Sequence, residues 1–350
     1  MPEQPPTFLV TGGAGFIGSA LVRLLVGQGH EVITLDALTY AGSRDNLAGV
    51  MESGLHTFVE GSICDRALVD GLLAEHRPRY LINVAAETHV DRSIDGPEAF
   101  VETNVVGTSR LLAAARAFER GGGAAIRYVQ VSTDEVYGTI DDGEFREGDP
   151  YRPNSPYAAS KAAADHMVRA YVRTYGLDAV ITHGSNTFGP RQFPEKLIPL
   201  MTLNAIEGKS LPVYGDGRNV RDWLYVDDHA AGIVAAALNG TSGESYNIGG
   251  GTEIENIQLV QKLCALLDRV RPAPDGTSYA GQITFVEDRP GHDFRYALSS
   301  AKARDQLGWQ PATAFEAGFE TAVAWYIENR DWCASITEQL YARERLGQAG

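Results

Sequence analysis

Tyr157 and Lys161 lie four residues apart in a stretch of helical pattern, so both side chains would project from one face of a helix. A neighbouring ammonium group stabilises a tyrosinate and lowers the tyrosine pKa from its usual value of about 10. Such a tyrosine can take the O–H proton of an alcohol while a nicotinamide cofactor takes the hydride. Thr133 ends an earlier predicted strand, where its hydroxyl could bind the substrate oxygen. Because Tyr-x-x-x-Lys also arises by chance, this interpretation needs a cofactor site elsewhere in the chain.

A glycine-rich turn near the N-terminus predicts that cofactor site. Gly12, Gly15 and Gly18 have G-x-x-G-x-x-G spacing between a predicted strand and a predicted helix. Glycines there permit a tight turn and a close approach of the pyrophosphate to the helix N-terminus. Asp36 ends the next predicted strand, where a carboxylate accepts hydrogen bonds from ribose hydroxyls and repels a 2′-phosphate. NAD is therefore favoured over NADP, although Arg44 weakens the preference slightly, and a glycine turn without a ligand is the alternative.

Alternating strand and helix patterns must position these residues. Predicted strands occupy residues 8–10, 31–36, 55–60, 79–84, 126–132 and 179–185, and predicted helices occupy residues 16–27, 65–76, 97–119 and 156–175. This alternation predicts an α/β fold with a Rossmann-like, doubly wound parallel sheet. Ligands of such sheets bind in the crevice at the carboxyl ends of the strands.

The pattern changes after Gly189, where prolines and glycines interrupt the alternation. We therefore predict an NAD-binding domain over residues 1–188. Residues 189–350 are expected to form mainly a smaller substrate-binding lobe, with some segments returning to the sheet. The last predicted helix covers residues 313–329, and Thr313 and Glu316 have the spacing of a capping box.

Composition excludes several classes of protein. The 350 residues include 30 Lys and Arg against 45 Asp and Glu, a net charge of −15, which argues against a nucleic-acid or anionic-membrane surface. No apolar run reaches the length of a membrane-spanning helix, and the N-terminus lacks a signal-peptide pattern. The three cysteines, Cys64, Cys264 and Cys333, are far apart and fit a reducing cytoplasm. No His, Cys and Asp cluster has the spacing of a metal site.

Taken in order, these motifs resemble the extended short-chain dehydrogenase/reductase family over about residues 7–330. Residues 132–138, Ser-Thr-Asp-Glu-Val-Tyr-Gly, are similar to a signature of the dTDP-glucose 4,6-dehydratases within it. Five other segments resemble the same enzymes: residues 87–93, 193–199, 221–225, 246–249 and 288–293. The resemblance implies a lyase that uses a tightly bound NAD, regenerated in every turnover, to dehydrate dTDP-glucose.

The same resemblance assigns roles to Asp134 and Glu135. A ketone at C4 of a hexose makes the C5 proton acidic, so a carboxylate can remove it while a carboxylic acid protonates the departing C6 hydroxyl. The resemblance implies that Glu135 is the base and Asp134 the acid. Two adjacent carboxyl groups also repel each other's charge, which favours protonation of one. The alternative is a solvated acidic turn.

The resemblance also implies two sets of binding residues. The expected cofactor-binding residues are Gly12, Gly15, Phe16, Ile17, Gly18, Asp36, Leu38, Thr39, Ser62, Ile63, Ala85, Ala86, Thr103, Tyr157, Lys161 and Thr187. The expected substrate-binding residues are Thr88, Thr133, Asn186, Lys196, Leu197, Pro212, Tyr214, Arg221, Asn256, Arg289 and His292. Among the second set, Arg221 and Arg289 are the strongest candidates to bind the diphosphate, and the alternative for each is a surface ion pair.

Some positions depart from the pattern of the dehydratases. Ser62 replaces an Asp near the adenine, His183 replaces an Arg, and Thr187 replaces a second Asn. His89 could serve as an acid or base, but a histidine that only shapes the crevice is the favoured interpretation. Three alternatives to this function remain: a UDP-glucose 4,6-dehydratase, a nucleotide-sugar epimerase or decarboxylase, and a non-catalytic protein of the same fold.

The helices predicted around residues 98–119 and 157–175 carry apolar residues on more than one face. Alanines 113–115 and 162–164 would permit close helix approach. The resemblance implies a homodimer in which both helices pair with their copies in a four-helix interface. The alternative is that the later lobe covers both helices.

Overall fold

The computed structural model describes residues 5–340, with side chains through residue 336. A parallel sheet of seven strands forms its centre, in the order β10-β6-β5-β4-β1-β2-β3. The strands are β1 (Phe8–Thr11), β2 (Val32–Asp36), β3 (His56–Glu60), β4 (Tyr80–Asn83), β5 (Arg127–Thr133), β6 (Ala179–Gly184) and β10 (Ser245–Ile248). The predicted Rossmann-like sheet is thus confirmed, and six of its strands match the predicted ranges within one residue at each end.

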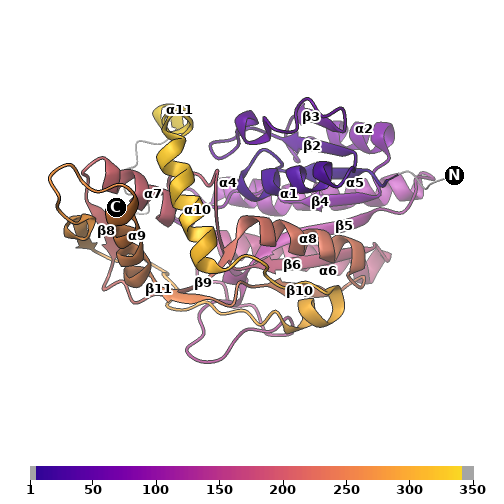
Figure 1. Ribbon diagram of the computed structural model, residues 1–350. Helices are drawn as coiled ribbons and strands as arrows, with labels where there is room; N and C mark the ends of the chain where they lie inside the picture. The colour runs from indigo at the N-terminus through magenta and orange to yellow at the C-terminus, as the bar shows by residue number, and fades with distance from the viewer. Residues whose placement is uncertain (1–4, 341–350) are drawn as a thin grey trace.

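Helices cover both faces of the sheet because successive side chains of a strand point to opposite faces. Phe8 and Val10 pack with α1 (Phe16–Gly27) and α8 (Val226–Asn239), whereas Leu9 packs with the opposite layer. That layer contains α2 (Arg66–His76), α5 (Thr108–Arg120) and α6 (Pro156–Tyr175). Figure 1 shows the strands running between these helices.

The strand order reverses between β1 and β4. From β1 the chain moves outward to β2 and β3, and then β4, β5, β6 and β10 extend the sheet on the other side. A crevice forms at such a switch point, outside the carboxyl ends of the strands. The residues that follow β1, β4 and β5 therefore meet at one edge of the sheet.

The later lobe has its own small sheets. One contains β7 (Asn186–Phe188), β9 (Val220–Tyr225) and β11 (Glu253–Glu255), and the other contains β8 (Leu211–Tyr214) and β12 (Ile283–Val286). Their helices are α7 (Leu197–Ile206), α9 (Asn256–Val270), α10 (Phe315–Glu328) and α11 (Arg330–Leu340). In Figure 1 this lobe lies to the left of the main sheet. Two later elements return to the main sheet: β10 is one of its strands, and α8 packs on one of its faces.

The helix predicted over residues 97–119 is continuous but not uniform. It consists of α4 (Glu98–Phe100), a π-helical segment over Val101–Gly107, and α5. Asn104 in the π segment donates to Ser160 Oγ at 2.8 Å and accepts from the backbone N–H of Glu87 at 2.9 Å. A Cβ atom at Gly107 would lie 2.6 Å from the Ile63 side chain. The wider turn thus brings Asn104 to the site and lets the helix pack closely.

One predicted helix start is wrong. α10 begins after Ala314, and no described side chain caps it, so Thr313 and Glu316 do not form a capping box. The Thr313 backbone N–H instead donates to Asp228 Oδ2 at 2.9 Å. The tertiary contact with α8 therefore replaces the local cap. The remaining short elements are α3 (Val90–Asp95), η1 (Arg44–Leu47), η3 (Asp134–Tyr137), η4 (Tyr279–Gln282) and the π-helical η5 (Ala303–Leu307).

Candidate active site

The glycine turn between β1 and α1 is held in a shape that few other residues could adopt. Gly12 has φ +69°, and a Cβ atom there would lie 2.6 Å from the Ala85 backbone. A Cβ atom at Gly18 would lie 2.0 Å from the Gly12 carbonyl oxygen. Asp36 fixes the loop, because its two carboxylate oxygens accept from the Ala14 and Leu38 N–H groups at 2.8 Å each.

A cavity of about 320 Å³ opens at this turn. Its chemistry fits a dinucleotide, because the N-terminus of α1 and the Asp36 carboxylate both face it. Of the predicted cofactor-binding residues, these line it: Gly12, Gly15, Phe16, Ile17, Gly18, Asp36, Thr39, Ser62, Ile63, Ala85, Ala86, Thr103, Tyr157 and Thr187. Leu38 and Lys161 do not line this cavity, and contact of the set with a cofactor stays a prediction.

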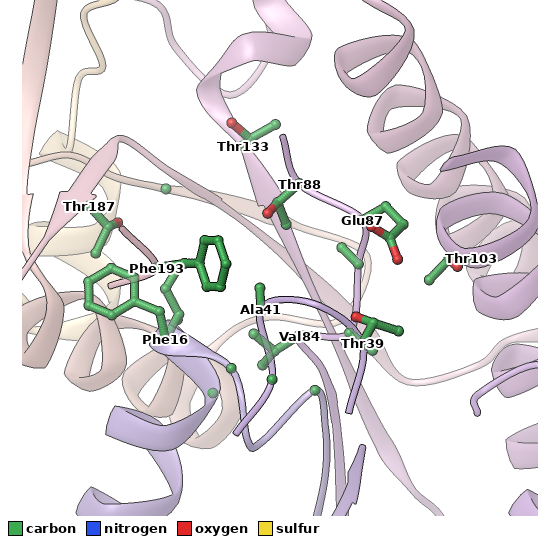
Figure 2. Close-up of a pocket in the computed structure, with 18 of the residues that line it drawn as sticks. Phe16, Thr39, Ala41, Val84, Glu87, Thr88, Thr103, Thr133, Thr187 and Phe193 are labelled. Carbon is green, nitrogen blue, oxygen red and sulfur yellow. The ribbon is translucent and has the colours of Figure 1, made fainter. Parts of the chain in front are cut away.

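Sequence reasoning did not assign Glu87 or Phe193 to this cavity, although both line it. Figure 2 shows the Phe193 ring near the ring of the predicted Phe16, and Glu87 on the other side with the predicted Thr39 and Thr103. Phe193 belongs to a segment that the resemblance had singled out, yet its ring was not assigned to the cofactor cavity. Nothing in the local pattern signals that contact, because Phe193 lies beyond the predicted domain boundary.

Thr133 and Tyr157 meet at the inner end of the cavity. Thr133 is the last residue of β5. Tyr157 is in the first turn of α6, where Ser155 accepts from the Ala158 N–H at 3.1 Å and Pro156 begins the helix. The structure therefore brings together the strand end and the helix start that the sequence had linked.

The protonation chemistry of Tyr157 differs from the sequence-based expectation. Burial raises the tyrosine pKa well above its ordinary value, the charges of Glu135 and Asp134 raise it further, and a hydrogen bond with Thr133 opposes them. Lys161 is also buried, which lowers its pKa to about 8, and its Nζ donates to the Val131 carbonyl at 2.5 Å. The expected lowering of the Tyr157 pKa is therefore wrong for this structure.

Asp134 and Glu135 do not form a solvated turn. Asp134 is only 2% exposed, and its Oδ2 has no hydrogen-bond partner in the described part of the chain. Burial raises its pKa well above the ordinary value, and the neighbouring charge of Glu135 adds to the shift. Burial also raises the pKa of Glu135, but Arg289, Lys196 and Arg221 oppose that shift. The pair thus combines a carboxyl group whose surroundings favour the protonated form with one that has three cations nearby.

A second cavity of about 250 Å³ adjoins the first. Four residues line both cavities and mark their junction: Glu135, Asn186, Glu195 and Lys196. The predicted substrate-binding residues in the second cavity are Asn186, Lys196, Leu197, Pro212, Tyr214, Arg221, Asn256, Arg289 and His292, while Thr88 and Thr133 line the first. The structure thus gathers this whole set around the junction, and its binding role stays a prediction.

The two predicted phosphate ligands differ in their surroundings. Arg221 is 5% exposed and donates to the backbone carbonyls of Val220 at 2.8 Å and Asp293 at 2.9 Å. Arg289 donates to Asp91 Oδ1 at 2.6 Å, and its buried Nε has no partner among the described residues. Arg289 therefore retains a free donor, whereas much of Arg221 already binds the chain.

Two further polar residues line the second cavity. Burial lowers the pKa of His292 to about 4, and its Nδ1 lies 2.6 Å from Asp288 Oδ1. Burial lowers the pKa of His89 to about 2, and His89 Nδ1 accepts from the Arg92 N–H at 3.3 Å. These neutral imidazoles support the interpretation of His89 as a residue that shapes the crevice.

The departures from the dehydratase pattern have structural partners. Ser62 Oγ accepts from the Cys64 N–H at 3.1 Å. Thr187 Oγ1 lies 2.8 Å from His229 Nδ1, and His183 is buried between Tyr137 and Tyr151. Across residues 5–340, no group of three His, Cys, Asp or Glu side chains could hold a metal ion. No helix in that range is long and apolar enough to span a membrane.

A parallel sheet with a glycine turn at β1, a strand-end threonine and the Tyr157–Lys161 pair defines an extended short-chain dehydrogenase/reductase. Comparison with known proteins agrees: the chain belongs to the GDP-mannose 4,6 dehydratase family, whose model matches residues 9–322. A dTDP-glucose 4,6-dehydratase of Xanthomonas campestris pv. campestris is 52% identical over 97% of this chain and 99% of its own. The dTDP-glucose 4,6-dehydratase 1 of Escherichia coli K12 is 48% identical, and the match covers 95% of this chain and 96% of that enzyme.

Solved structures extend the likeness. The dTDP-glucose 4,6-dehydratase DesIV of Streptomyces venezuelae, solved with NAD and TYD bound, has a TM-score of 0.87 and 47% identity, covering 94% of this chain and 99% of its own. A UDP-glucose 4-epimerase of Thermus thermophilus in complex with NAD has a TM-score of 0.81 and 31% identity, over 92% and 99%. The fold is thus shared by dehydratases and epimerases, and the site must distinguish them.

Proposed function

We propose that this protein is an NAD-dependent dTDP-glucose 4,6-dehydratase, a hydro-lyase that forms dTDP-4-keto-6-deoxyglucose. One observation carries the proposal: Asp134 is buried at the edge of the first cavity, and Glu135 beside it lines both cavities where they meet. Epimerisation or decarboxylation needs no acid at C6, whereas loss of water from C6 does. Nearly full-length similarity to dTDP-glucose 4,6-dehydratases supports the same conclusion.

The first step is oxidation of the C4 hydroxyl of glucose. Tyr157 takes the hydroxyl proton, and Thr133 binds the same oxygen. NAD supplies the hydride acceptor for this chemistry and, once reduced, the hydride donor. Burial and the nearby carboxylates raise the Tyr157 pKa, and the hydrogen bond with Thr133 opposes that rise. A cationic Lys161, four residues along the same helix face, would favour the tyrosinate as well.

Elimination of water uses the acid pair. Glu135 removes the C5 proton, which the C4 ketone makes acidic, and Arg289, Lys196 and Arg221 favour its ionised form. Burial and the charge of Glu135 favour the protonated form of Asp134, which in that form donates its proton to the departing C6 hydroxyl. Hydride return to C6 and reprotonation of C5 complete the turnover, which leaves the cofactor oxidised and bound.

Each part of the chain has a place in this proposal. Residues 1–188 hold NAD through the glycine turn, Asp36 and the other residues around the first cavity. Residues 189–350 hold mainly the nucleotide sugar, with Arg289 and Lys196 near its diphosphate and Pro212 and Tyr214 near its base. Such local cations let a chain with a net charge of −15 bind a dianionic group.

Product analysis tests the proposal. Purified protein is incubated separately with dTDP-glucose, UDP-glucose and UDP-glucuronate, without added reductant, and product mass is followed. We expect loss of one water from dTDP-glucose with no net accumulation of NADH. Unchanged mass with inversion at C4 would identify an epimerase, and loss of carbon dioxide from UDP-glucuronate a decarboxylase. Because a buried methyl group contributes only ~1–3 kcal/mol, slower turnover of UDP-glucose is compatible with the proposal.

The same proposal includes a cytoplasmic homodimer. The three widely separated cysteines suit a reducing compartment. Val101, at the start of the π-helical segment, is 52% exposed, and Tyr175, at the end of α6, is 48% exposed. These apolar groups support an interface in which both helices pair with their copies in a four-helix arrangement.

A further inference from the structure

A buried carboxylate lies behind the proposed catalytic residues and has no part in the steps described above. Asp165 is on α6, fully buried, four residues beyond Lys161. Its Oδ2 accepts hydrogen bonds from Ser132 Oγ at 2.7 Å and Tyr151 OH at 3.1 Å. His183 Nε2 lies 3.4 Å from the same oxygen and 2.6 Å from Tyr151 OH. Burial of a carboxylate is costly unless hydrogen bonds or a cation compensate for its lost hydration.

The network connects directly to the Tyr157–Lys161 pair. Tyr157, Lys161 and Asp165 are spaced four residues apart, so they lie along one face of α6. Lys161 Nζ donates to the carbonyl of Val131, and the next residue, Ser132, donates to Asp165. Lys161 and Asp165 therefore bind adjacent residues of β5, and Lys161 is the middle residue of the three along the helix face.

The negative charge of Asp165 can change the protonation state of Lys161. Burial lowers the lysine pKa to about 8, and the negative charge of Asp165 opposes this shift. Within the described residues, Asp165 forms no ion pair with Lys or Arg, since Arg169 donates to Tyr151 OH at 2.8 Å instead. The other titratable groups around this part of α6 are Tyr137, Asp134 and Glu135 from η3, Tyr151 and Glu147 from the preceding loop, and His183 from β6.

We propose that Asp165 is a positioning residue that keeps Lys161 cationic and aligned with Tyr157 during oxidation of the substrate alcohol. This inference rests on the proposed function, because a cationic lysine on the same helix face favours the tyrosinate that takes the hydroxyl proton in that step. Ser132, Tyr151 and His183 hold the carboxylate in place without cancelling its charge by a permanent cation.

The test compares D165N with Y151F. D165N keeps the shape of the side chain and removes its charge. Y151F keeps that charge and removes the hydroxyl group that binds Asp165, His183 and Arg169. In D165N we expect the alkaline limb of the kcat profile to move to lower pH by about one unit, with kcat near pH 8 falling about fivefold and KM little changed. In Y151F the limb should stay at the wild-type pH. An alkaline limb at the same pH in wild type and D165N would overturn the proposal.

A second readout does not require turnover. The chain has five lysines, so the ε-carbon resonance of Lys161 can be assigned in protein labelled with [ε-¹³C]lysine. We expect Lys161 to titrate at lower pH in D165N than in wild type, and an unchanged titration contradicts the proposal. The titration does not depend on whether dTDP-glucose reacts. Failure of the proposed function is therefore seen in a separate experiment, in which wild-type protein dehydrates no nucleotide sugar.

A third variant covers the case in which D165N does not fold. H183R places a permanent cation against Asp165 and neutralises its field at Lys161 without removing the carboxylate. The Lys161 titration should again move to lower pH, by less than in D165N. A Lys161 titration at the wild-type pH in folded H183R would show that Asp165 does not control the lysine charge.

Discussion

The carboxylate of Asp91 accepts a hydrogen bond from the guanidinium of Arg289 at 2.6 Å, although 198 positions separate the two residues. Asp91 is in α3, on the sheet side of the second cavity, and is only 5% exposed. Its other oxygen accepts from Tyr214 OH at 3.3 Å. One carboxylate therefore fixes two residues of the later lobe against the residues that follow β4, and it orients Arg289 toward the cavity.

Asp91→Asn should weaken nucleotide-sugar binding more than it slows chemistry. The variant leaves Arg289 without its charged partner, so the guanidinium loses its fixed direction and the buried charge is uncompensated. We expect KM to rise roughly tenfold and kcat to change by less than about threefold. Asp70→Asn is the control, because its pair with Arg66 is exposed and should contribute little. Steady-state kinetics that show an unchanged KM would argue against this role of Asp91.

Asp134→Asn combined with Glu135→Gln should separate oxidation from dehydration. Tyr157 and Thr133 remain, so C4 oxidation proceeds and reduced cofactor accumulates on the enzyme. Without a proton donor at C6 or a base at C5, we expect water loss to fall by a factor of about 10² or more. Absorbance reports the trapped NADH and mass spectrometry the missing product. Normal dehydration by the double variant, matched against Asp142→Asn with Glu144→Gln in an exposed turn, would refute the assigned roles.

Gly18→Ala should abolish cofactor binding. The new Cβ atom would lie 2.0 Å from the Gly12 carbonyl oxygen, so the turn must open and the helix N-terminus must move. We expect purified protein to lose most of its bound NAD and several degrees of thermal stability. Gly27→Ala is the matched control on the same helix, because a Cβ atom there has no neighbour within 4 Å among the described residues. Retention of NAD by Gly18→Ala would contradict the proposed site.

Features with a local cause were predictable from sequence. The glycine turn, Asp36, Thr133 and the Tyr157–Lys161 pair each follow from a short spacing next to a strand or helix, and the order of strands fixes their meeting point. The acid pair was visible as two adjacent residues. Their burial was not, because it depends on the later lobe closing over the strand ends.

Features that depend on distant contacts could not be predicted. The partners of Asp91 lie in segments far along the chain, and Glu195 reaches both cavities only because the segment before α7 crosses the crevice. The prediction of a lowered Tyr157 pKa was wrong for the same reason. The spacing of Tyr157 and Lys161 is local, whereas the burial and the carboxylates that raise the pKa depend on the tertiary fold. The capping box failed because Asp228 competes for the helix start.

Lys161→Met should stabilise the fold while abolishing activity. The folded-state pKa of Lys161, about 8, is below the unfolded value of about 10.5, so folding at neutral pH must retain a proton in an unfavourable site. The penalty corresponds to about 3 kcal/mol at pH 7 and diminishes as pH rises from about 8 to 10.5. We therefore expect a higher Tm for the variant at pH 7 and a smaller difference from wild type at pH 10. A lower Tm at pH 7 would show that contacts of the ammonium outweigh its desolvation.

Val101→Arg and Tyr175→Arg should dissociate the proposed dimer. Both side chains are about half exposed on the long helices, and a charge at each would be buried on association. The alanines predicted to permit helix approach do not decide the matter, since Ala114, Ala115, Ala162 and Ala164 are buried within the chain itself. Phe285→Arg is the control, because Phe285 is 60% exposed on β12, away from both helices. Sedimentation at micromolar concentration should show a dimer for wild type and Phe285→Arg and a monomer for the other two variants, whereas a monomeric wild type would exclude the interface.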